Sequence, residues 1–254
     1  MCTVNKQKEI RWRRLQPHEG YLDRDYDFGY RQIPKIATTT TLSALREQRL
    51  SRSSNASSNH LLREPVHLWA NAQSASLTDV KYRYLVVRDP VKRFVSAYQN
   101  KVVASRSLQK IAAGQRGKDQ QSVVLDQQLE TCPSLAHYVE NFQAYSRIGV
   151  IRSHTRLLFE LLEGLDLSFY SEVFPMEQLS KFWHRLGDHL GSPLTLEHRQ
   201  KSGGGTNASL GRIDRDTFEK ILSITAEDYQ YLSAFYSVDK IVSEWEQAHR
   251  KNRQ

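Results

Sequence analysis

The chain has 254 residues, of which 39% are hydrophobic, and its 36 Lys and Arg residues outweigh 28 Asp and Glu residues to give a formal net charge of +8. This charge favours an anionic partner, such as a nucleic acid, a membrane surface, a nucleotide or an acidic glycan, without choosing among them. No apolar run approaches the roughly 18 residues of a membrane span, and the basic N-terminus lacks the apolar core of a signal peptide, so we expect a cytoplasmic protein. The two cysteines, Cys2 and Cys132, make neither a disulfide framework nor a zinc-binding spacing.

Hydrophobic periodicity predicts strands that alternate with helices along the chain. Short apolar runs predict strands, and apolar residues that recur three and four positions apart predict helices. The predicted strands span residues 30–33, 65–70, 82–87 and 167–175, and the predicted helices span 41–50, 91–101, 134–145, 176–191 and 225–237, the last with Thr225 as its N-cap. This alternation favours an α/β fold with a mainly parallel sheet covered on both faces, in which ligands bind at the carboxyl ends of the strands.

We expect a single domain over residues 29–240. An N-terminal tail or extension (residues 1–28) precedes it, and a C-terminal helical tail (residues 241–254) follows it. Within the domain, the polar segment 104–128 is open to two interpretations, an insertion or lid, or a loosely held helix. We expect this segment and the Ser/Asn-rich loop 50–60 to shape an acceptor-binding site.

The segment "IPKIATTTTL" (residues 33–42) lies between a predicted strand and a predicted helix. The first backbone N–H groups of a helix have no partner within it and carry partial positive charge, so they bind phosphate. Threonine hydroxyls and the charge of Lys35 add to this, and the small side chain of Ala37 lets the backbone approach a ligand. The segment is no Walker loop, and by itself it also fits a Thr-rich helix cap with a solvated lysine.

The segment "RDP" (residues 88–90) separates the strand 82–87 from the next helix. Asp89 suits the N-cap of that helix, and Pro90 suits its first position. Arg88 then stands at the carboxyl end of the strand, and Ser96 lies about 10 Å further along the helix axis. The two side chains could hold one anion between a guanidinium and a hydroxyl, or serve structural roles only.

The two segments together resemble a known family. "PKIATTTT" followed by "VVRDPVKRFVSAYQNK" is similar to the two nucleotide-binding motifs of 3′-phosphoadenylyl-sulfate-dependent sulfotransferases, most of all the carbohydrate sulfotransferases of family 2. Weaker similarities extend over residues 30–239. The resemblance implies a P-loop-like three-layer α/β domain and sulfuryl transfer to a hydroxyl of a carbohydrate or glycoconjugate, with 3′-phosphoadenylyl sulfate as co-substrate and adenosine 3′,5′-bisphosphate as product. The residues present require no metal, and their spacing suggests none, so we expect no metal.

The resemblance also implies residue roles. The 5′-phosphosulfate side of the donor would be held by Lys35, Ala37, Thr38, Thr39 and Thr40. The 3′-phosphate would be held by Arg88 and Ser96. Arg199 and Lys201 beside the glycine-rich loop 201–207 would close over the 3′-phosphate, or else belong to a flexible surface loop. Arg93 and Lys101 of the second motif support the nucleotide or cover the helix surface, with the surface role favoured.

Transfer to a hydroxyl needs a general base, and Lys35 is expected to stabilise charge on the leaving phosphate. In related sulfotransferases a histidine or acid stands at the end of the strand that precedes the arginine strand, which points to His67 as the base. His60 and Glu64 are its nearest rivals, and His154 is a further candidate for the base or for acceptor binding.

Two other functions remain open from the sequence. A nucleotide phosphotransferase with a divergent P-loop would bind similar ligands, although the chain lacks the Walker pattern. A basic nucleic-acid-binding protein would explain the charge and the segment "KEIRWRR", but no helix-turn-helix or aromatic RNA-binding motif supports it.

Overall fold

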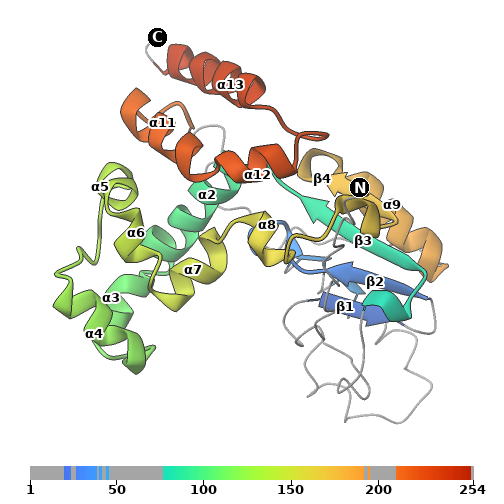
Figure 1. The fold of residues 1–254 in the computed structure, drawn as a ribbon, viewed down its shortest axis with the longest axis horizontal. Helices are drawn as coiled ribbons and strands as arrows, with labels where there is room; N and C mark the ends of the chain where they lie inside the picture. Colours follow the sequence, from blue (N-terminus) through green and yellow to red (C-terminus); the bar gives the residue numbers. More distant parts are fainter. Residues whose placement is uncertain are drawn as a thin grey trace, which may run out of the picture.

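The computed structural model describes residues 20–23, 27–38, 40–41, 44–45, 77–191, 194 and 210–252. These residues form a mixed α/β structure around a four-stranded sheet with the order β1-β2-β3-β4 (Figure 1). The strands are β1 (Gly20–Asp23), β2 (Phe28–Arg31), β3 (Tyr82–Val87) and β4 (Glu172–Pro175).

Three of the strands run in parallel, as the alternating pattern predicted. β2 pairs with β3 from Phe28 opposite Tyr82, and β3 pairs with β4 so that Val87 lies opposite Pro175. β1 falls within the expected N-terminal extension and pairs antiparallel with β2. Because parallel strands end at one edge of a sheet, the segments after β2, β3 and β4 emerge side by side.

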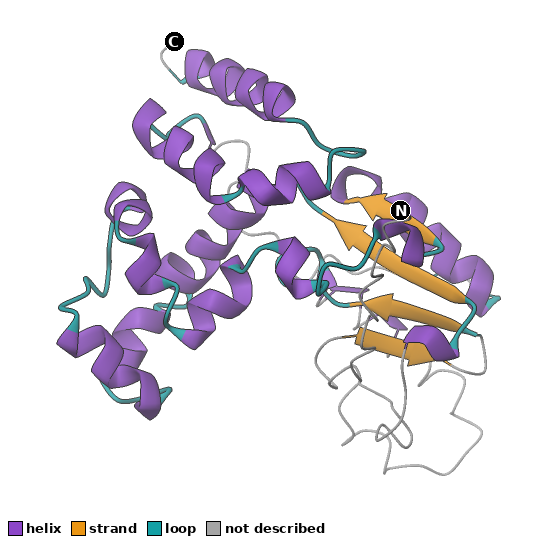
Figure 2. Cartoon of the chain, in the orientation of Figure 1, coloured by secondary structure: helices purple, strands orange, loops and turns teal. Residues whose placement is uncertain are grey.

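Helices make up most of the remaining described structure (Figure 2). The α-helices are α2 (Pro90–Tyr98), α3 (Ser107–Ala112), α4 (Lys118–Asp126), α5 (Leu135–Glu140), α6 (Phe142–Tyr145), α7 (Gly149–Thr155), α8 (Leu158–Leu161), α9 (Leu179–Leu190), α11 (Arg215–Ile224), α12 (Ala226–Tyr231) and α13 (Val238–Lys251). The shorter turns are the 3-10 segments η1 (Leu77–Asp79), η3 (Leu167–Phe169) and η4 (Met176–Gln178), and the π-helical segment η2 (Gln99–Ala104). No helix in the described part of the chain is long and apolar enough to cross a membrane.

Aromatic side chains join α9 to the sheet. The ring of Phe182 on α9 lies 5.2 Å from that of Tyr30 on β2, 6.3 Å from that of Tyr84 on β3 and 5.4 Å from that of Phe174 on β4. All four side chains are buried. Burial of aromatic surface of this size dominates the energetics of a core, so this cluster fixes one face of the sheet.

Several predicted elements are confirmed. β3 occupies the predicted residues, and Asp89 caps α2 by accepting from the Lys92 amide at 3.0 Å, with Pro90 at the first position. The helix predicted over 176–191 begins as η4, continues as α9 and ends at Gly191, whose φ of 62° only glycine adopts easily. Residues 38, 40, 41, 44 and 45 of the first motif and the helix after it are helical.

Other predictions are corrected. The helix expected over 134–145 breaks at Asn141 into α5 and α6, and only the end of the expected strand 167–175 forms β4. The side chain of Thr225 does not cap α12 as expected. Its hydroxyl instead donates to the Ile221 carbonyl at 2.8 Å, within the last turn of α11. The polar segment 104–128 contains α3 and α4, so helix accounts for much of it. The expected strand 65–70 and the loops 50–60 and 201–207 lie outside the described residues.

Candidate functional site

The candidate site lies where the parallel strands end. The first motif follows β2, Arg88 follows β3, and Glu177 follows β4. The hydroxyl of Tyr236 fixes this edge, lying 2.8 Å from Oε2 of Glu177 and 3.1 Å from the carbonyl oxygen of Val87. The sheet thus brings together segments that are far apart in the sequence.

The first motif forms a tightly turned loop. Lys35 and Ala37 both have left-handed backbone conformations, with φ of 73° and 46°, which cost energy in residues other than glycine. The hydroxyl of Thr38 donates to the carbonyl of Ile33 at 2.6 Å, and the amide of Thr41 donates to the carbonyl of Ala37 at 3.0 Å. Alternating backbone conformations of this kind can turn successive N–H groups toward one anion.

Arg88 ties the second motif to the first. Its Nη1 donates to the carbonyl oxygen of Lys35 at 3.0 Å. Burial lowers the pKa of Arg88, and the nearby negative charge of Glu177 opposes this effect. The guanidinium therefore lies against the strained loop, and Arg88 stands at the end of β3 as the sequence predicted.

The start of α2 is fixed by Asp89. This carboxylate is buried, accepts from the Tyr229 hydroxyl at 2.9 Å and has a pKa raised by burial. Ser96 lies in the second turn of the same helix and is half-buried. Arg88 and Ser96 thus lie at the end of β3 and within α2, and their joint binding of an anion stays a prediction.

Cations gather around the loop. The pKa of Lys35 is lowered to about 8, first by burial and then by the positive charges of Lys101 and Arg88. The pKa of Lys101 is lowered by burial and by the charge of Arg116. Lys101 is carried by η2, and π-helical segments often occur at functional sites. Like charges held together in a partly desolvated site favour binding of an anion, because it would relieve their repulsion.

His154, at the end of α7, belongs to the same electrostatic environment. Its pKa is lowered to about 4 by burial, by the charge of Lys101 and, to a smaller extent, by the charges of Lys35 and Arg93. The sequence named this residue as a candidate for acceptor binding or for the base.

Arg93 has a role that the sequence analysis missed. It does not cover the helix surface, as was favoured, since only 3% of it is exposed. Its Nη1 donates to the carbonyl of His154 at 3.3 Å, and its Nη2 contacts the carboxylate of Asp228 on α12 at 3.4 Å and donates to the carbonyl of Arg156. Asp228 in turn accepts from the amide of Leu158 at 2.6 Å. Arg93 therefore locks α2 against α7, α8 and α12.

Several predicted site residues lie outside the described residues. These are His60, Glu64, His67, Arg199 and Lys201. Nothing is described for Thr39 either, whereas Thr40 is half-buried in the helical part of the first motif. The roles of the residues that are not described stay predictions. Within the described ranges, no group of three or more His, Cys, Asp or Glu side chains could hold a metal ion.

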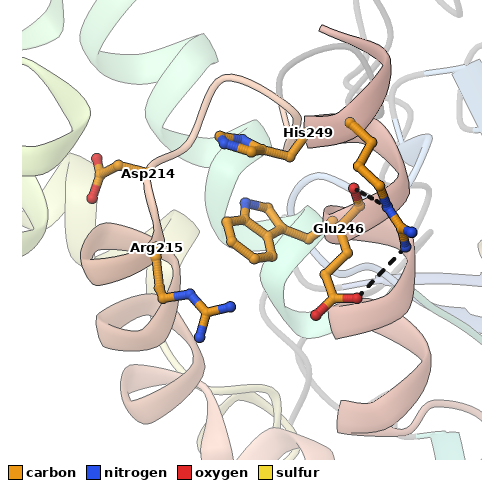
Figure 3. Close-up of a pocket in the computed structure, with 6 residues that line it drawn as sticks. Asp214, Arg215, Glu246 and His249 are labelled. Carbon is orange, nitrogen blue, oxygen red and sulfur yellow. Dashed lines mark hydrogen bonds and ion pairs between the residues drawn. The ribbon is translucent and has the colours of Figure 1, made fainter. Parts of the chain in front are cut away.

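A separate pocket of about 480 Å³ lies between the N-terminus of α11 and the C-terminal half of α13 (Figure 3). Its polar side chains are engaged with their own structure. Asp214 caps α11, Trp245 donates to the carbonyl of Ile213 at 2.9 Å, and Arg250 lies 3.8 Å from Glu246. The ring of His249 stacks on Trp245, and its Nδ1 lies 3.2 Å from the carbonyl oxygen of Gly211. The pocket thus lies between two helices, and no residue of either motif lines it.

Comparison with known proteins gave one match. A family model described as the sulfotransferase family matches residues 19–239. The match includes all four strands, both motifs and the helices from α2 to α12. No curated protein and no solved structure matched the chain.

Proposed function

The chain belongs to the sulfotransferase family, and we propose that it transfers a sulfuryl group from 3′-phosphoadenylyl sulfate to a hydroxyl of a carbohydrate or glycoconjugate. The observation that carries this proposal is the contact of Arg88 with the backbone of Lys35 at the carboxyl edge of the sheet. It joins the two motifs that resemble the donor-binding motifs of carbohydrate sulfotransferases. We also propose that the domain has a P-loop-like, three-layer arrangement.

The residues present fit an anionic donor. Lys35, Lys101 and Arg88 bring positive charge to one strained loop, and the lowered pKa of Lys35 reflects their mutual repulsion as well as burial. Lys35, Ala37 and the threonines at 38–40 would hold the 5′ side, and Arg88 with Ser96 would hold the 3′-phosphate. Arg199 and Lys201 are proposed to close over it.

The donor would supply the activated sulfuryl group. Because sulfuryl transfer is electronically close to phosphoryl transfer, the protein contributes mainly orientation and charge stabilisation. Lys35 would stabilise the negative charge that develops on the leaving phosphate, an effect worth about 10²- to 10³-fold in rate for a single preorganised donor. No resident metal is proposed, and His67 is the base expected from the sequence.

The test uses donor carrying ³⁵S and a panel of polysaccharides with free hydroxyls. We expect label to pass from 3′-phosphoadenylyl sulfate to at least one polysaccharide, and to fall by about 10²-fold or more in Lys35→Met. Transfer of ³²P from the γ-position of ATP to an acceptor, with no sulfuryl transfer, would instead establish the phosphotransferase alternative. Binding to an oligonucleotide without any transfer would favour the nucleic-acid-binding alternative.

A further inference from the structure

His154 lies on a segment that is held against the donor-binding helix. It is in the last turn of α7, beside α2 (Figure 1). Arg93 of α2 donates to the carbonyl of His154 at 3.3 Å, and the buried Asp228 anchors the same arginine. The half-buried ring is therefore carried by the backbone that the second motif fixes.

The contacts of Nδ1 determine which nitrogen of this ring carries the proton. Nδ1 lies 3.0 Å from the carbonyl oxygen of Val150, which can only accept, so Nδ1 must carry the proton. The Ser153 hydroxyl lies 2.9 Å from Nδ1 and 3.2 Å from the same carbonyl, so it can accept from Nδ1 while it donates to Val150. In the neutral ring Nε2 is then unprotonated and free to accept a proton. Nε2 has no hydrogen-bond partner among the described residues.

Cations from three different elements act on the ring. They are Lys101 of η2, Lys35 of the loop after β2, and Arg93 of α2. No carboxylate of the described residues is among the groups whose charge shifts this histidine. The ring is thus held neutral beside the positive charges that would receive the donor.

We propose that His154 is the general base of the transfer, accepting the proton of the acceptor hydroxyl at Nε2. This assignment, which rests on the proposed function, takes the place of His67. As the acceptor oxygen bonds to sulfur, the bond between sulfur and the bridging oxygen breaks, adenosine 3′,5′-bisphosphate leaves, and the hydroxyl proton passes to Nε2.

The surrounding charges make the base dependent on the donor. A pKa of about 4 makes His154 a weak base in the free protein. Burial, the largest cause of the lowered pKa, would remain, but the anionic groups of a bound nucleotide would neutralise the charges of Lys101 and Lys35, so the pKa of His154 would rise above its value in the free protein. The residue would become a stronger base once the donor has bound, which favours proton abstraction in the productive complex.

The first test compares His154→Asn with the wild type. The Asn amide can still donate to the Val150 carbonyl from the position of Nδ1, but it has no group equivalent to Nε2. We expect affinity for adenosine 3′,5′-bisphosphate within about threefold of wild type and a kcat lower by about 10²- to 10⁴-fold. His184→Gln, at an exposed position of α9, is the matched control and should keep wild-type turnover. Turnover of His154→Asn within threefold of wild type would overturn the assignment.

The second test needs no acceptor. Calorimetric titration with adenosine 3′,5′-bisphosphate at pH 5.5, in two buffers of different ionisation enthalpy, measures the protons taken up on binding. Wild type and His184→Gln should take up more protons than His154→Asn, and the comparison between proteins cancels the protons released by the nucleotide's own phosphates. Equal uptake in all three proteins would overturn the inference and leave the proposed function standing. If wild type does not bind this nucleotide at all, the proposed function itself fails.

Discussion

The guanidinium of Arg88 and the backbone carbonyl of Lys35 form a hydrogen bond of 3.0 Å between residues 53 positions apart in the sequence. One residue follows β3 and the other follows β2, and the parallel pairing of these strands makes the contact possible. The bond positions Arg88 and the strained loop relative to each other. This relationship turns two separate sequence motifs into one candidate anion site, and the predictions below depend on it.

The first prediction concerns the protonation of Lys35. Its lowered pKa means that it loses its proton above about pH 8 in the free protein, whereas a bound anion favours the charged form. Binding should therefore be coupled to proton uptake above pH 8. Affinity for adenosine 3′,5′-bisphosphate should fall by about tenfold per pH unit as pH rises from 8 toward the bound-state pKa.

Two variants check the assignment to Lys35. Lys35→Met should bind more weakly at pH 7 and lose the steep fall in affinity above pH 8. Lys101→Met removes one of the charges that depress the pKa of Lys35, so the fall should begin at a higher pH. An unchanged pH profile in Lys35→Met would show that another group titrates.

The second prediction concerns the buried pair of Arg93 and Asp228. Arg93→Met would leave the Asp228 carboxylate buried without its cation, which should destabilise the protein by about 3–5 kcal/mol. Asp228→Asn added to this variant should recover part of the loss, because an amide oxygen can still accept from the Leu158 amide. Unfolding in urea measures both effects. A loss below about 1 kcal/mol in Arg93→Met would contradict the structural role assigned to this arginine.

The third prediction concerns the left-handed conformation of Ala37. Its φ of 46° costs an L-residue about 1–2 kcal/mol, whereas glycine adopts it without that cost. After the larger entropy loss of glycine on folding, Ala37→Gly should be more stable than wild type by about 0.5–1 kcal/mol. Ala37→Val should be less stable and bind the nucleotide more weakly, since a β-branched side chain fits this conformation poorly.

The control for this prediction is the same exchange inside a regular helix. Ala248→Gly, within α13, should lose about 1 kcal/mol or more. Urea unfolding of the three variants gives the comparison. If Ala37→Gly loses as much stability as Ala248→Gly, the strain assigned to the loop is absent.

The sequence predicted the strand and helix around Arg88 well because the signals there are local. A short, mainly apolar run, an Asp N-cap and a Pro at the first helical position specify β3 and α2 independently of the remaining chain. For a similar reason the sequence predicted that the first motif lies between a strand and a helix.

The features that the sequence could not reveal depend on distant partners. Arg93 looks like a surface residue in the helical pattern, and its partner Asp228 follows 135 residues later. The left-handed conformations of Lys35 and Ala37 carry no glycine signal. His154 was one of several candidates in the sequence, and the cations on three elements that act on its ring are brought together only by the folded chain. The sequence did indicate Lys101 as a candidate site residue, because it is the last residue of the second motif.

The central claim is that Arg88 selects a nucleotide with a 3′-phosphate. The most direct test is the affinity for adenosine 3′,5′-bisphosphate compared with that for ADP, measured by calorimetry in wild type, in Arg88→Ala and in Arg185→Ala, which removes an arginine from the exposed face of α9. We predict at least a tenfold preference for the 3′-phosphorylated nucleotide in wild type and in Arg185→Ala, and loss of this preference in Arg88→Ala, as expected when a charged hydrogen bond worth about 1.5–3 kcal/mol is removed. Equal affinities of the wild-type protein for the two nucleotides would contradict the account.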